Sequence, residues 1–169
     1  MNSASFFWRL IPLKLILLKM PHKKSFNTAH KILEREILEV FKACYTDFPK
    51  ARIKTFESPD FQLIVNRHKT IGLEIVRYVT DPELIDDSDY SRFEPERIQE
   101  LIAKKEQKSL IYKRMRYFEL WLLIVSGSNP LEPVLLHPES LDTSVFDSSF
   151  FDKIFYLDMR RNRLYQLQK

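Results

Sequence analysis

Along residues 28–45, hydrophobic residues recur at the spacing of one face of an α-helix. Asn27 or Thr28 can cap this helix at its start, and the pattern ends near Tyr45. Apolar residues recur three and four positions apart and predict one buried face: Leu33, Ile37, Val40, Phe41 and Cys44. A second long helix is predicted from Pro95, which suits a first helical turn, to about Arg116.

Strand-like segments lie between these two helices. Residues 60–65 and 70–78 are rich in β-branched and aromatic side chains, and the four polar residues between them predict a β-hairpin. A shorter strand is predicted over residues 51–56. Residues 80–93 are acidic and show no periodicity, which predicts a loop.

The C-terminal part of the chain predicts further strands. Residues 120–125 form a continuous apolar run, which is typical of a strand buried on both faces. Residues 153–157 and 163–167 flank a charged turn and predict a two-strand ending, with a short helical turn before it near residues 148–151. The order helix, three strands, helix, strand and final strand pair predicts an α/β protein with a central mixed sheet flanked by helices.

The first nineteen residues differ from the rest of the chain. They are apolar but are interrupted by Arg9, Pro12 and Lys14, which is unsuitable for a membrane span. We expect residues 1–19 to be an extension outside the core, preceding an alternative start at Met20. A membrane-surface anchor is the other interpretation. Residues 20–169 are then a single domain.

Composition narrows the function classes. The 169 residues are 44% hydrophobic and 13% aromatic, which predicts a globular fold. With 2 Gly and no GxGxxG or GxxxxGK[ST] motif, nucleotide-binding folds that need glycine-rich turns are disfavoured. A net charge of +4 is a mild bias towards polyanionic partners. The single cysteine, Cys44, excludes an intramolecular disulfide and fits a cytoplasmic location.

Two carboxylates on the predicted hairpin are the strongest candidates for chemistry. Asp60 opens one strand and Glu74 lies on the next, so the hairpin can bring both to one end of the sheet. Neighbouring carboxylates repel each other unless a cation lies between them. Oxygen ligands suit Mg²⁺ or Mn²⁺, and such a metal can activate water for phosphodiester cleavage.

The motifs around these carboxylates resemble those of a known superfamily. They are Pro59-Asp60-Phe61, the strand GLEI at residues 72–75, a lysine-bearing helix and the strand WLLI at residues 121–124. In this order they are similar to the PD-(D/E)XK nucleases, most of all to small bacterial members, over residues 28–167. The resemblance implies a restriction-endonuclease-like core and metal-dependent cleavage of nucleic acid, with DNA preferred over RNA.

The chain departs from this superfamily at the lysine that normally follows the glutamate by two residues, where it has Val76. The resemblance allows a lysine from the following helix to replace it. At about 100° per residue, Lys105 falls in the middle of the apolar face formed by Ile98, Ile102 and Tyr112. Its ammonium either reaches the carboxylates or extends to solvent along the edge of the helix.

The remaining candidates come from the two helices. The resemblance implies a glutamate from the first helix in the metal site, for which Glu36 is the choice and Glu34 the substitute. Lys104, Lys108 and Lys113 are candidates for contact with a phosphate backbone. Because Val76 replaces the expected lysine, a catalytically inactive nucleic-acid or protein interaction module is the alternative to a metal-dependent nuclease.

Overall fold

The computed structural model describes residues 22–79, 90–92, 94–128, 134–136 and 146–168. The chain divides into two compact units, residues 1–33 and residues 34–169. No helix among the described residues is long and apolar enough to cross a membrane. The predicted domain boundary at residue 19 lies outside the described residues.

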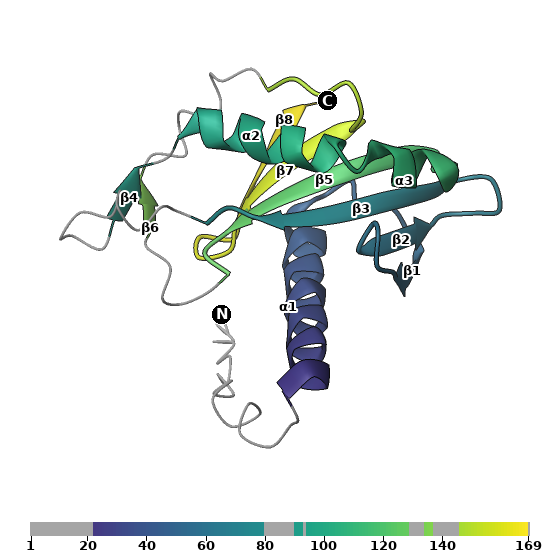
Figure 1. The fold of residues 1–169 in the computed structure, drawn as a ribbon, viewed down its shortest axis with the longest axis horizontal. Helices are drawn as coiled ribbons and strands as arrows, with labels where there is room; N and C mark the ends of the chain where they lie inside the picture. Colours follow the sequence, from purple (N-terminus) through teal and green to yellow (C-terminus); the bar gives the residue numbers. More distant parts are fainter. Residues whose placement is uncertain (1–21, 80–89, 93, 129–133, 137–145, 169) are drawn as a thin grey trace, which may run out of the picture. The chain divides into compact units, whose positions relative to one another are not determined.

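An open mixed sheet of six strands forms the centre of the second unit (Figure 1). Its order is β1-β2-β3-β5-β7-β8, with β3, β5 and β7 parallel and the other neighbours antiparallel. The strands are β1 (Arg52–Thr55), β2 (Phe61–Ile64), β3 (Thr70–Arg77), β5 (Glu119–Ser126), β7 (Lys153–Asp158) and β8 (Arg163–Gln168). The predicted α/β class and mixed sheet are confirmed.

The central strands are buried on both faces, as expected for parallel strands covered by helices. Helix α1 (His22–Cys44) covers one face from Glu34 onward, and the Phe41 ring lies 5.0 Å from that of Phe155. Helices α2 (Pro95–Glu106) and α3 (Ser109–Arg114) lie along the other face (Figure 1). There they pack on an apolar cluster that includes Leu122 and Ile124.

Several predicted boundaries differ from the structure. The predicted second helix breaks at residues 107–108 into α2 and α3, at a point where no Gly or Pro gives a local signal. The predicted loop at 80–93 contains a short strand, β4 (Tyr90–Arg92), which pairs in parallel with β6 (Val134–Leu136). Both have three residues, too few to show a hydrophobic period. The segment 148–151 is a bend instead of a helical turn.

Candidate active site

The predicted hairpin brings Asp60 and Glu74 together. Asp60 immediately precedes β2, and the register of β2 on β3 pairs Phe61 with Leu73. The Asp60 carboxylate reaches across to β3, where its Oδ2 accepts a hydrogen bond of 2.7 Å from the backbone N–H of Ile75. Asp60 is therefore fixed beside the strand position that carries Glu74.

Gly72 permits the close approach of the segment that carries Asp60. A Cβ atom on Gly72 would lie 2.9 Å from Cγ of Pro59 and 2.7 Å from Cδ1 of Leu120. The proline immediately before Asp60 thus packs directly on the β3 backbone. The glycine of the GLEI motif is needed here for space, because any side chain would displace Pro59 or Leu120.

The environment of Asp60 disfavours its negative charge. Burial, followed by the charge of Glu74, raises the pKa of Asp60 to about 7, and the charge of Glu34 acts in the same direction. The Ile75 hydrogen bond and the Lys105 charge oppose this effect. The environment therefore favours the protonated form of Asp60, whereas a further cation beside its carboxylate would favour the ionised form.

Lys105 supplies the cation that the sequence predicted from α2. Its Nζ donates to Oε1 of Glu74 at 2.6 Å and to the backbone carbonyl of Ile75 at 3.3 Å. The Glu74 side chain is 4% exposed and that of Lys105 is 18% exposed. Val76 packs against the apolar cluster under α2. The cation beside Glu74 therefore comes from α2, while position 76 of the strand carries an apolar residue.

The structure favours Glu34 over Glu36 as the first-helix carboxylate. Glu36 is exposed, whereas Glu34 is 8% exposed and acts on the charge of Asp60. At about 100° per residue, Glu34 lies within about 60° of Ile37, Leu38 and Phe41, which form the buried face of α1. The predicted buried face did not include Leu38. Without Leu38, the centre of the predicted face lay closer to Glu36 than the centre of the observed face does. Glu36 lies on the exposed side of α1, and its role in a metal site stays a prediction.

Sequence reasoning assigned Tyr112 to packing alone and missed its place beside the carboxylates. Its side chain is 2% exposed, and its hydroxyl lies beside Ser58 and Glu74 without a well-formed hydrogen bond to either. Burial, followed by the Glu74 charge, raises the pKa of Tyr112. The signal in the sequence was weak, because a tyrosine on an apolar helical face is usually explained by its ring.

The donor set around Glu74 fits a divalent cation in part. Oε2 of Glu74 is buried and has no hydrogen-bond partner within the described residues. Such an oxygen needs a proton or a cation to offset its burial. Across the described ranges, no three His, Cys, Asp or Glu side chains are grouped as a metal site. If a cation bound to Asp60 and Glu74, its remaining ligands would be water or phosphate oxygens, as is usual for Mg²⁺.

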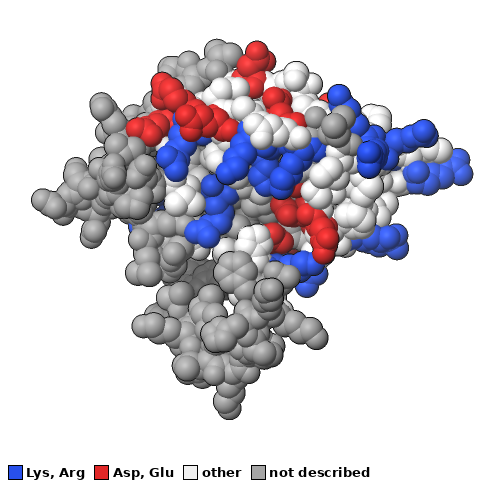
Figure 2. Space-filling view, in the orientation of Figure 1, with Lys and Arg blue, Asp and Glu red and all other residues white. Residues whose placement is uncertain are grey.

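Positive charge lies on the two helices that cover this face of the sheet. Lys104, Lys108 and Lys113 are all exposed on or beside α2 and α3. Figure 2 shows Lys and Arg atoms over α3 and along the lower side of α2, with a group of Asp and Glu atoms just below them. The exposed lysines therefore belong to the same helices as Lys105 and Tyr112, the two residues that reach Glu74.

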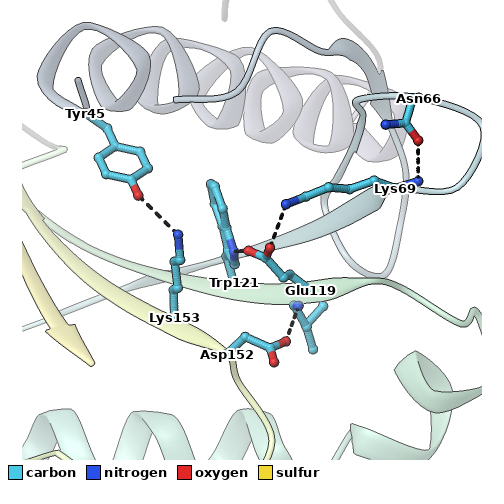
Figure 3. Close-up of polar contacts among 8 residues, drawn as sticks. Tyr45, Asn66, Lys69, Glu119, Trp121, Asp152 and Lys153 are labelled. Carbon is cyan, nitrogen blue, oxygen red and sulfur yellow. Dashed lines mark hydrogen bonds and ion pairs between the residues drawn. The ribbon is translucent and has the colours of Figure 1, made fainter. Parts of the chain in front are cut away.

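A second polar network lies on the other side of the sheet (Figure 3). The Glu119 carboxylate accepts hydrogen bonds from Lys69 Nζ at 2.9 Å and from Trp121 Nε1 at 2.7 Å. Partial burial acts to raise the pKa of Glu119, but the hydrogen bonds from Lys69 and Trp121 outweigh it, and the pKa is lowered. Lys153 Nζ lies 4.9 Å from the Trp121 ring centroid and donates to the Tyr45 hydroxyl. Each charge in this network has a partner, which is typical of a structural role.

Comparisons of the chain with protein-family models, with curated proteins and with solved structures found no match.

Proposed function

We propose that this protein is a metal-dependent nuclease of the PD-(D/E)XK type with a restriction-endonuclease-like core. Its substrate is nucleic acid, DNA in preference to RNA, and its metal is Mg²⁺ or Mn²⁺. Asp60 and Glu74 are the proposed metal ligands, and Lys105 is the proposed catalytic cation.

One observation carries the proposal: Lys105 contacts Glu74 from α2. An ammonium group is costly to bury, and on the apolar face of α2 this cost is offset only when the ammonium has a charged partner. Lys105 contacts Glu74, and Asp60, whose pKa is raised, lies beside Glu74. Two carboxylates and one cation thus lie together in a largely buried site. Such groups, with pKa values shifted by burial and by specific charge partners, are typical of functional sites.

Each residue has a defined task in this mechanism. A divalent cation bound there supplies charge neutralisation of the phosphate and activation of water. Asp60 is held by the Ile75 N–H and presents its carboxylate at a fixed position. Lys105 Nζ orients the attacking water and stabilises the charge on the phosphate oxygens. The water oxygen bonds to phosphorus and gives up a proton to solvent, the bond from phosphorus to the leaving oxygen breaks, and the leaving oxygen takes up a proton from solvent.

The alternative function is a catalytically inactive module that binds nucleic acid or protein. It is favoured by the same short contact, since Lys105 occupies Oε1 of Glu74 and neutralises a ligand that a metal would need. A metal must then displace the ammonium or share the carboxylate through Oε2.

A cleavage assay with matched variants tests the proposal. Purified wild type is incubated with single-stranded DNA, duplex DNA and RNA, in Mg²⁺, in Mn²⁺ and in EDTA. Asp60→Asn and Lys105→Met should abolish metal-dependent cleavage. Lys54→Met, the same change on an exposed lysine of β1, should retain it. Equal cleavage by Asp60→Asn and wild type would refute the assignment, and metal binding without cleavage of any substrate would favour the inactive module.

A further inference from the structure

A pocket of about 250 Å³ opens between α3, the start of β5 and the segment before β7. It adjoins the candidate active site through Tyr112, whose side chain lines the pocket while its hydroxyl lies beside Glu74. Tyr117, another lining residue, lies near the Gly72 position against which Pro59 also packs. The pocket and the candidate active site therefore lie on the same side of the sheet and are joined by the Tyr112 side chain.

Aromatic rings and cations line this pocket together. Tyr112, Tyr117 and Phe150 contribute rings, and Lys113 and Arg116 contribute positive charge. The Tyr112 and Phe150 ring centroids are 5.8 Å apart, and Lys113 Nζ lies 5.9 Å from the Phe150 ring centroid. Rings that can stack on a base, beside cations that can bind its phosphate, are the combination used to hold single-stranded nucleic acid.

The wall that carries Phe150 is held in place before any ligand binds. The Ser148 hydroxyl donates to Oε1 of Glu106 on α2 at 2.6 Å. The same oxygen of Ser148 accepts hydrogen bonds from the backbone N–H groups of Phe150 and Phe151. The bend is thereby tied to α2, so little order needs to be gained when a base stacks on Phe150.

Asp152 gives the pocket a hydrogen-bond acceptor at one end. Its Oδ2 accepts from the backbone N–H of Leu120 at 2.7 Å, and its own N–H donates to the Leu120 carbonyl (Figure 3). A carboxylate fixed in this way repels a phosphate but accepts hydrogen bonds from the amino group of a base. The cations of the pocket thus suit the sugar–phosphate part of a nucleotide, and Asp152 suits its base.

We infer that this pocket binds one unpaired nucleotide next to the bond that is cleaved, so that the substrate is single-stranded or locally opened nucleic acid. The inference rests on the proposed function, since it takes nucleic acid as the ligand. In a duplex both faces of each base are stacked and its edge is paired, so a base enters such a pocket only after it leaves the helix.

Fluorescence anisotropy in EDTA tests the inference without requiring catalysis. The probes are a labelled single-stranded oligonucleotide, a fully abasic strand of the same length and the corresponding duplex. Wild type should bind the single strand about tenfold or more tightly than the abasic strand, and more tightly than the duplex. Phe150→Leu keeps apolar bulk but removes the ring, and it should weaken single-strand binding about 5- to 150-fold, the range for loss of one stacked base.

Two further variants make the test decisive. Arg116 has a φ of 49°, a conformation that asparagine tolerates, so Arg116→Asn should fold. Because it removes a positive charge, it should weaken the binding of both the normal and the abasic single strand. Lys54→Ala removes an exposed charge on β1, outside the pocket, and should change affinity much less. Equal affinity for normal and abasic strands, or unchanged binding by Phe150→Leu, would overturn the inference. Base-dependent binding together with the absence of cleavage would refute the proposed catalysis while leaving the nucleotide pocket in place.

Discussion

Replacement of Lys105 by methionine separates the electrostatic from the packing role of this side chain. Methionine keeps most of the apolar stem and removes the ammonium, which leaves the Glu74 carboxylate, 4% exposed, without its partner at 2.6 Å. Breaking a buried pair in this way costs about 3 to 5 kcal/mol. Because Lys105 itself retains 18% exposure, we expect the lower end, about 3 kcal/mol. For a protein of this size that corresponds to a fall in Tm of about 6 to 12 °C.

Glu74→Gln and the double variant complete the test. Removal of both charges should restore part of the loss, with a coupling energy of about 2 kcal/mol in urea denaturation at neutral pH. Mg²⁺ should stabilise Lys105→Met more than wild type, because a cation replaces the missing charge beside Glu74. Additive effects of the two substitutions, or a Lys105→Met protein as stable as wild type, would refute the view that this pair is coupled.

Three other changes follow from the same geometry. The pKa of Asp60 is raised from 3.8 to about 7, so metal-free stability should fall between about pH 4 and pH 7 as the unfolded chain loses this proton first. In Asp60→Asn, the decrease in the free energy of unfolding over this pH range should be smaller by up to about 4 kcal/mol. Denaturation in EDTA at several pH values measures it. Gly72→Ala should destabilise the protein by about 1 to 3 kcal/mol through contact with Pro59, and a thermal melt equal to wild type would contradict the close packing. Glu34→Gln should lower the pKa of Asp60, seen as a shifted pH–stability curve, whereas Glu36→Gln should leave it unchanged.

The strands and the central carboxylates were predictable because their signals are local. The apolar run of β5 and the polar turn between β2 and β3 fix the hairpin and the buried strand, and with them the proximity of Asp60 to Glu74. The position of Lys105 was also predictable, since Ile98 and Ile102 define the buried side of α2 within two turns.

Features that depend on tertiary packing were not predictable in the same way. The break between α2 and α3 has no Gly or Pro, and the three-residue strand β4 pairs with a segment more than 40 positions away. The preference for Glu34 depends on which side of α1 meets the sheet, and one omitted leucine was enough to shift it. The pocket beside Tyr112 joins three segments that no single sequence pattern connects.

Calorimetric titration of the protein with Mn²⁺ measures whether Asp60 and Glu74 hold a divalent cation. Wild type should show one site per chain, Asp60→Asn should bind at least tenfold more weakly, and Glu36→Gln, which removes an exposed carboxylate, should bind like wild type. Binding that is equal in wild type and Asp60→Asn, or absent from both, would contradict the metal site on which the proposed nuclease depends.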